Sequence, residues 1–131
     1  MTNLLEGKKA LITGSRRGIG AGIAKCMARE GAAVIVNYFK SKESAIKVVE
    51  EIKAAGGTAI AIKADVSDFT QVESMVNQTI SELGKVDIMV ANAGTKGHGK
   101  PLIELSQDEF SYTINNHLIG AFNCARSVLP Y

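Results

Sequence analysis

The sequence predicts an α/β fold in which a doubly wound parallel sheet carries helices on both faces. Strand-like apolar runs alternate with helix-like periods along the 131 residues, and only short breaks separate them. Hydrophobic residues make up 46% of the chain but aromatic ones only 5%, which suits a core of Ala, Val, Ile and Leu. A glycine-rich turn joins the first strand to the first helix. Because strand crossovers are right-handed, we expect the strand order 3-2-1-4 and a ligand at the carboxyl ends of the strands.

The first strand, residues 8–13, runs into the turn formed by Gly14, Gly18 and Gly20. Unpaired amides at a helix start, together with the helix dipole, favour a bound phosphate, and glycine lets the phosphate approach the backbone. The spacing is neither Gly-x-Gly-x-x-Gly nor that of a P-loop, so the turn alone could equally be only a tight turn. In the helix that follows, every fourth residue is apolar: Ile19, Ile23 and Met27.

The later elements follow in regular alternation. We expect strands at Ala32–Asn37, Thr58–Ala64 and Val86–Val90. A helix at Ser41–Ala55 ends at Gly56, and the next is capped by Ser67 or Asp68 and stopped by Gly84. Their apolar stripes are Ala45, Val48, Val49 and Ile52, then Val72, Met75, Val76, Ile80 and Leu83.

A long last helix is predicted over residues 106–128. Ser106 and Glu109 have the spacing of a capping box at its start. Its apolar positions at helical spacing are Phe110, Ile114, Leu118, Phe122 and Ala125.

Composition excludes several classes of function. Fifteen basic and thirteen acidic residues leave a formal charge of +2, too small to indicate a nucleic-acid or membrane partner. The N-terminal residues do not resemble a secretory signal, and no apolar run is long enough for a membrane span. Cys26 and Cys124 fall in helical patterns and are expected to be buried or half-buried thiols of a cytoplasmic protein. No Cys/His cluster has metal-ligand spacing, so we expect no metal site.

Four segments in the right order resemble the short-chain dehydrogenase/reductase family. Thr13–Gly20 resembles its Thr-Gly-x-x-x-Gly-x-Gly turn, and Asp65-Val66 its adenine-contacting pair. Residues 91–94, Ala-Asn-Ala-Gly, resemble its Asn-Asn-Ala-Gly segment, and residues 117–120, His-Leu-Ile-Gly, its Asn-Leu-x-Gly. The resemblance covers the chain from about residue 7 to the end. It implies a single Rossmann domain that binds NAD or NADP, spans residues 1–131 and is incomplete at its C-terminus.

The resemblance also implies where the cofactor binds. Asp65 would accept a hydrogen bond from the adenine, although an isolated Asp there more often forms a turn or a cap. Asn92 and Gly94 would lie beside the nicotinamide ribose, although Asn92 alone is a common turn residue. The complete set of expected cofactor-binding residues is Gly14, Ser15, Arg16, Arg17, Gly18, Ile19, Gly20, Asn37, Tyr38, Asp65, Val66, Asn92, Ala93 and Gly94.

The charge around the second strand favours NADP over NAD. NAD sites place an acid at the end of that strand, against the ribose 2′-OH. Here the position is Asn37, and Arg16, Arg17 and Lys40 can supply positive charge to a 2′-phosphate. The alternative is that these three are ordinary solvated bases.

The family reaction transfers a hydride between nicotinamide and a carbonyl or alcohol carbon, with a Tyr and a Lys four residues later as acid–base pair. The family has these residues after a fifth strand, so we expect no catalytic residue in this chain. Tyr38 and Lys42 match the spacing but lie on the adenosine side. His117 stands where the family usually has an Asn, and His98 is expected to be exposed.

Three interpretations therefore stay open. The chain is the cofactor half of an oxidoreductase with a small-molecule substrate, a non-catalytic dinucleotide-binding module, or a structural protein with a vestigial site. The resemblance also implies a homo-oligomer, a tetramer or a dimer, in which the helix over 106–128 packs against its copy. A sheet that ends at the fourth strand would leave residues 88–90 at an apolar edge.

Overall fold

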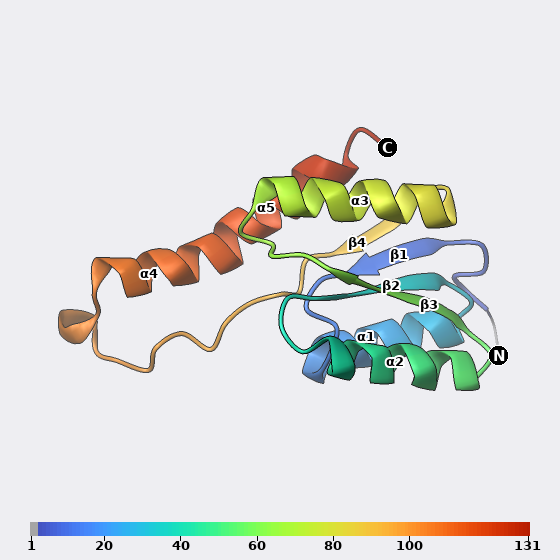
Figure 1. The fold of residues 1–131 in the computed structure, drawn as a ribbon, viewed down its shortest axis with the longest axis horizontal. Coiled ribbons are helices and arrows are strands. Elements are labelled where there is room, and N and C mark those ends of the chain that lie inside the picture. The colour runs from blue at the N-terminus through green and yellow to red at the C-terminus, as the bar shows by residue number, and fades with distance from the viewer. Residues whose placement is uncertain (1–2) are drawn as a thin grey trace.

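A computed structural model of the chain describes residues 3–131 and shows the predicted doubly wound fold (Figure 1). Four parallel strands lie in the order β3-β2-β1-β4, as expected. Helices α1 and α2 cover one face of the sheet, and α3 and α5 cover the other. The strands are β1 (Lys9–Ile12), β2 (Ala33–Tyr38), β3 (Thr58–Lys63) and β4 (Ile88–Val90).

The helices keep the predicted order, with one long helix divided. They are α1 (Gly18–Arg29), α2 (Lys42–Ala54), α3 (Phe69–Leu83), the 3₁₀ turn η1 (Leu102–Glu104), α4 (Gln107–Ile114), the π-helical segment η2 (Asn115–Ile119) and α5 (Gly120–Val128). No helix of residues 3–131 has both the length and the apolar character that a membrane span requires.

Successive side chains along each strand point to opposite faces of the sheet and so form two hydrophobic cores. Ala10 and Ile12 of β1 face α1 and α2, whereas Leu11 between them faces α3 and α5. Strand β2 does the same with Val34 and Val36 against Ile35. Both sides of each central strand are buried, which explains why these strands are continuous apolar runs.

Helix ends follow the predicted caps. Asp68 accepts hydrogen bonds from the amides of Thr70 and Gln71, which decides between the two candidate caps of α3. Gly84 ends α3 in the left-handed conformation. Ser106 and Glu109 form both hydrogen bonds of the predicted capping box at the start of α4.

The stripe predicted for α1 is displaced around the helix. Its buried positions are Ala21, Ala24 and Ala28, while Ile23 and Met27 are half-buried and Ile19 is 78% exposed. Small residues face the sheet because α1 lies close to it. Cys124 is buried as expected, but Cys26 is exposed, so the expectation of a buried thiol was wrong for Cys26.

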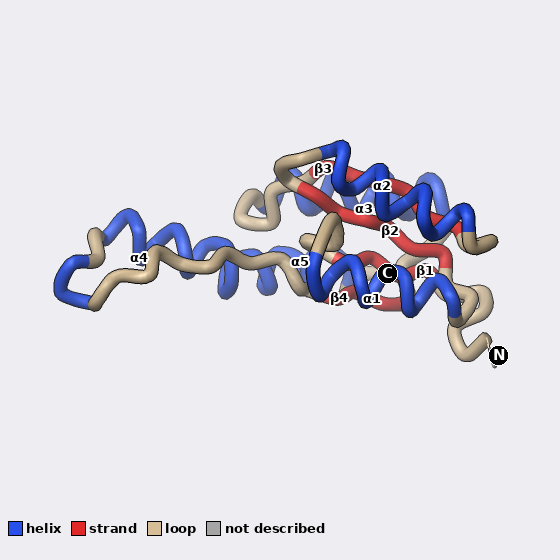
Figure 2. Tube along the Cα trace, turned by 90° about the horizontal axis from the view of Figure 1, so that it is seen from below, coloured by secondary structure: helices blue, strands red, loops and turns tan. Residues whose placement is uncertain are grey.

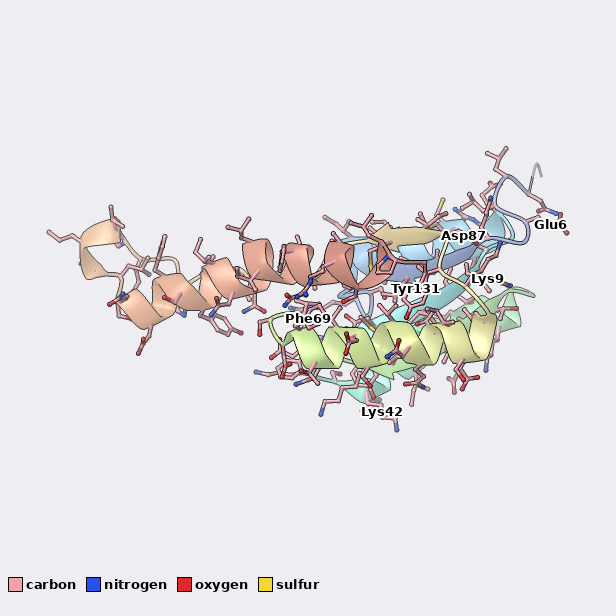
Figure 3. All side chains as sticks on the ribbon, turned by 90° about the horizontal axis from the view of Figure 1, so that it is seen from above. Glu6, Lys9, Lys42, Phe69, Asp87 and Tyr131 are labelled. Atoms are coloured by element: carbon pink, nitrogen blue, oxygen red, sulfur yellow. The ribbon has the colours of Figure 1, made fainter. Side chains whose placement is uncertain are left out.

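Residues 95–119, which are most of the loop after β4 together with α4 and η2, extend beyond the end of the sheet, and we call them the arm (Figures 1 and 2). Many side chains of the arm project outward from it, away from the sheet (Figure 3). Three apolar positions predicted for this helix, Phe110, Leu118 and Phe122, are each more than half exposed. The buried residues of α5 are instead Gly120, Asn123, Cys124 and Ser127.

Strand β4 forms one edge of the sheet. Within residues 3–131 it pairs only with β1, from Ala10↔Ile88 to Ile12↔Val90. The amide of Lys9 donates to Asp87 Oδ2 at 2.7 Å, which fixes the register just before β4 (Figure 3). The predicted open apolar edge is therefore present.

Candidate functional site

A cleft of about 450 Å³ lies at the carboxyl ends of the four strands. Every strand contributes to it through the residues that follow it, and α1 contributes its first turn. The arm closes one end with Tyr112 and Asn116. The lining residues are Gly14, Arg16, Arg17, Gly18, Ile19, Gly20, Asn37, Tyr38, Phe39, Lys40, Ala64, Asp65, Val66, Asn92, Ala93, Gly94, Thr95, Lys96, Tyr112 and Asn116.

All the residues predicted to bind the cofactor line this cleft except Ser15. Ser15 is fully buried behind the turn. Its hydroxyl donates to Ile12 O at 2.7 Å and accepts from the backbone N–H of Asn37 at 3.0 Å. Ser15 therefore supports the turn from behind and does not face the cleft.

The glycines of the turn are required by its geometry. Gly14 and Gly18 have φ of 61° and 58°, in the region that favours glycine. A Cβ on Gly20 would lie 2.5 Å from Gly14 O and 2.6 Å from Asn92 Nδ2. The turn thus brings the start of α1 against the ends of β1 and β4.

The first turn of α1 presents backbone amides to the cleft. Asp68 and Ser106 cap α3 and α4, but no side chain of residues 3–131 caps the start of α1. The first amides of a helix have no partner within the helix. Those of Gly18, Ile19 and Gly20 are therefore available to an anion in the cleft.

Asn37 holds the floor of the cleft together. Its Oδ1 accepts from the Gly14 amide at 2.9 Å, and its Nδ2 donates to Ile62 O at 3.2 Å and Ala64 O at 3.3 Å. The side chain is almost completely buried. The amide at the end of β2 thus joins the glycine turn to β3, a role that the sequence did not reveal.

Thr13 and Asn92 join β1 to β4 at the opposite side of the turn. Thr13 Oγ1 accepts from the amides of Asn92 at 2.9 Å and Ala93 at 3.0 Å. Asn92 Nδ2 donates to Thr13 O at 3.1 Å and Gly14 O at 3.2 Å. Asn92 thereby orients the turn as well as lining the cleft.

Asp65 forms a turn and also lines the cleft. Its Oδ1 accepts from the Ser67 amide at 2.9 Å and the Ser67 hydroxyl at 2.7 Å, which is the turn role. Asp65 also lines the cleft after β3, where a ligand can meet it.

The charge of the cleft is mainly positive. Among the described lining residues the basic ones are Arg16, Arg17, Lys40 and Lys96, and the acidic one is Asp65. Arg16 and Arg17 lie in the glycine turn and Lys40 follows β2, so three of the bases gather around the end of β2.

Sequence reasoning missed the residues that the arm contributes. Thr95, Lys96, Tyr112 and Asn116 line the end of the cleft next to β4. The i, i+4 spacing of Tyr112 and Asn116 places them on one helix face, which was the available signal. Nothing in the sequence showed that this face turns toward the cleft.

Within the arm, Glu109 joins the start of α4 to the loop before it. Lys100 Nζ lies 3.0 Å from Glu109 Oε1 and 2.8 Å from Oε2, and His98 Nε2 lies 3.9 Å from Oε2. The bond from Lys100, with those from Ser106, lowers the pKa of Glu109 from 4.5 to about 2. His98 is exposed as predicted, and its ring meets Tyr112 edge-on at 6.0 Å.

Comparison with known proteins identifies the family. The family described as short chain dehydrogenase matches residues 8–131. The chain therefore belongs to the short-chain dehydrogenase family, as its motifs indicated.

Relatives in the family are enzymes of oxidation and reduction. The chain is 43% identical over 123 residues to a 3-oxoacyl-(acyl-carrier-protein) reductase of Staphylococcus aureus, covering 94% of this chain and 50% of the relative. It is 42% identical over 130 residues to a probable tetrahydroxynaphthalene reductase of Zymoseptoria tritici, and the match covers 99% of this chain and 48% of the relative. The chain thus spans about half the length of the curated relatives it matches.

Solved structures show the same fold. A dehydrogenase/reductase from Sinorhizobium meliloti superposes with a TM-score of 0.95 at 41% identity, covering 99% of this chain and 51% of that one. A short-chain dehydrogenase from Burkholderia cenocepacia in complex with NADP superposes with a TM-score of 0.92 at 39% identity. The match covers 97% of this chain and 51% of that one.

Proposed function

We propose that this chain is the dinucleotide-binding half of an NADP-dependent oxidoreductase that transfers a hydride between nicotinamide and a carbonyl or alcohol substrate. The observation that carries the proposal is the cleft itself, in which uncapped helix amides, a glycine turn and strand ends from the whole sheet meet. In folds of this kind the diphosphate binds at the first helix start.

The lining residues suggest how the dinucleotide lies. The adenosine would rest between the ends of β2 and β3, against Tyr38 and Asp65. The diphosphate would bind the amides of Gly18–Gly20. The nicotinamide would reach Asn92–Gly94 and the arm, and the cofactor would supply the hydride there.

The charges favour a 2′-phosphate on the adenosine ribose. Arg16, Arg17 and Lys40 border the end of β2, where such a phosphate would lie. The NADP complex of the Burkholderia cenocepacia relative agrees with this choice.

We assign no catalytic acid or base to the described residues. Tyr38 is buried at the end of β2, away from β4, so its match with Lys42 has no catalytic meaning. Tyr112 lines the nicotinamide end, but Asn116 stands where a Lys partner would be. A dinucleotide-binding module without catalysis is therefore the second candidate function.

Titration with the two cofactors tests the proposal. We expect NADPH to bind at least about tenfold more tightly than NADH, since charge-assisted hydrogen bonds contribute about 1.5–3 kcal/mol. The double variant Arg16→Gln, Arg17→Gln should lose most of this preference and leave NADH binding nearly unchanged. Lys53→Gln, at the exposed end of α2, is the matched control and should change neither affinity.

Two outcomes separate the parts of the proposal. Equal affinities for NADPH and NADH would refute the NADP assignment but keep the dinucleotide site. Binding of neither cofactor would refute the site. Cofactor binding without turnover by this chain alone is expected of both candidate functions, so the intact mass of the natural protein would separate the oxidoreductase from the non-catalytic module.

We further propose a cytoplasmic homo-oligomer. The two free cysteines fit a reducing compartment. The exposed apolar residues of α4, η2 and α5 form the surface through which copies would associate.

A further inference from the structure

His117 contacts the rim of the cleft in an unusual way. Its Nε2 lies 2.9 Å from the Thr95 amide nitrogen and 3.0 Å from the Thr95 carbonyl oxygen. The ring also covers Gly94, because a Cβ on Gly94 would lie 2.4 Å from His117 Cε1. One imidazole nitrogen thus faces a donor and an acceptor of the same residue.

A single ring nitrogen can serve only one of these partners at a time. With its proton on Nδ1, the neutral imidazole accepts at Nε2 from the Thr95 N–H. With a proton on Nε2, the ring can only donate there, to the Thr95 carbonyl. In each state the imidazole leaves the other backbone group of Thr95 to water or to a ligand.

We propose that His117 is a protonation-dependent positioning residue that decides which backbone group of Thr95 the cleft offers to a ligand. The neutral imidazole binds the Thr95 N–H and leaves the carbonyl as an acceptor. The imidazolium binds the carbonyl and leaves the N–H as a donor. Thr95 lines the cleft between Gly94 and Lys96, so the change occurs at the site itself.

The charged and titratable groups around this end of the cleft come from the loop after β4 and from α4. Lys96 and His98 lie on the loop with Thr95, and Glu109 and Tyr112 lie on α4, where His98 approaches both. Histidine is the side chain whose charge ordinarily changes between about pH 5 and 8, and this interval sets the pH range of the test.

The effect on a ligand rests on the proposed function, because it assumes that the nicotinamide half of the cofactor lies at Thr95. The contact between His117 Nε2 and the backbone of Thr95 does not depend on that assumption. It can therefore be tested without cofactor, and its failure is distinct from a failure of dinucleotide binding.

The test follows the imidazole nitrogens and the Thr95 amide by NMR from pH 5 to 8.5 in the cofactor-free protein, with ¹⁵N-labelled histidine. The His117 resonances are those lost in His117→Asn, and His98→Asn is the matched control, since His98 is exposed on the same loop. We expect neutral His117 to be protonated on Nδ1. The Thr95 amide shift should follow the His117 midpoint, and below it this amide should exchange about fivefold faster relative to its intrinsic rate.

The Asn variant distinguishes the proposal from a purely structural role. Its side chain has both a donor and an acceptor, so it can serve both Thr95 groups at every pH. In His117→Asn the chemical shift and the exchange rate of the Thr95 amide should not change with pH beyond the intrinsic rate. In His98→Asn both should change with pH as in the parent protein. A neutral imidazole protonated on Nε2, or a Thr95 amide indifferent to the His117 titration in the parent protein, would overturn the proposal without any variant.

Discussion

Gly20 is the residue on which the turn depends most strictly. In Gly20→Ala the new Cβ would meet backbone and the Asn92 amide at 2.5–2.8 Å, so the turn must shift. We expect a loss of about 1–3 kcal/mol in stability and at least about tenfold in NADPH affinity. Thermal unfolding and cofactor titration measure the two effects.

Gly22→Ala is the matched control on the same helix. No atom lies within 4 Å of its Cβ position, and Gly22 is exposed. This variant should leave cofactor binding unchanged and stabilise the fold by roughly 0.5–1 kcal/mol. Similar losses in both variants would show that glycine flexibility matters and close approach does not.

Asn37 explains why the end of β2 carries an amide. In Asn37→Asp the donor to Ile62 O and Ala64 O is lost, and a carboxylate is buried against two carbonyl oxygens. We expect a loss of about 2–4 kcal/mol at neutral pH, measured by denaturant unfolding.

The loss in Asn37→Asp should depend on pH with a definite sign. Burial raises the pKa of such a carboxyl, so the folded state holds its proton longer than the unfolded one. The destabilisation is then smaller at about pH 4 and grows as the pH rises. A variant equally stable at both pH values would contradict the hydrogen-bonding role of Asn37.

Among the elements, the arm has Glu109 as the shared partner of Lys100 and Ser106. In the fold the pKa of this carboxyl is lowered from 4.5 to about 2, chiefly by Lys100. Its contribution is therefore complete above pH 4.5 and is lost as the pH falls toward 2. In Lys100→Met the Glu109 pKa should rise toward 4.5, as a carboxyl ¹³C titration would show. Lys85→Met, at a bridge far from the arm, should leave it unchanged.

Elements of this fold could be predicted because their signals are local. The stripe of α2 and the capping box of α4 are set by neighbours a few residues apart, and both are confirmed. The buried face of α1 could not be predicted, since close approach of the helix to the sheet selects alanines over Ile19. The division of the last helix at η2 was also missed.

The site shows the same division. Most lining residues next to the strand ends were predictable from motifs that follow each strand, but those of the arm were not. The inward role of Asn37 and the approach of Tyr112 were not, because they depend on which way a side chain or the arm turns.

At the scale of the whole molecule, the exposed apolar surface of the last helix predicts association. Leu118 and Phe122 are 63% and 57% exposed, and β4 leaves an edge of the sheet unpaired within the described chain. We expect a dimer or tetramer by sedimentation. Leu118→Lys with Phe122→Lys should shift it toward monomer, whereas Ile46→Lys on α2 should not. A parent chain that sediments as a monodisperse monomer would contradict this surface.

The most direct measurement of the central claim is a crystal structure of the protein with NADPH. The account predicts the diphosphate on the amides of Gly18–Gly20, the 2′-phosphate beside Arg16, Arg17 or Lys40, and the nicotinamide next to Thr95. A cleft that stays empty at saturating NADPH, or a diphosphate bound elsewhere, would contradict it.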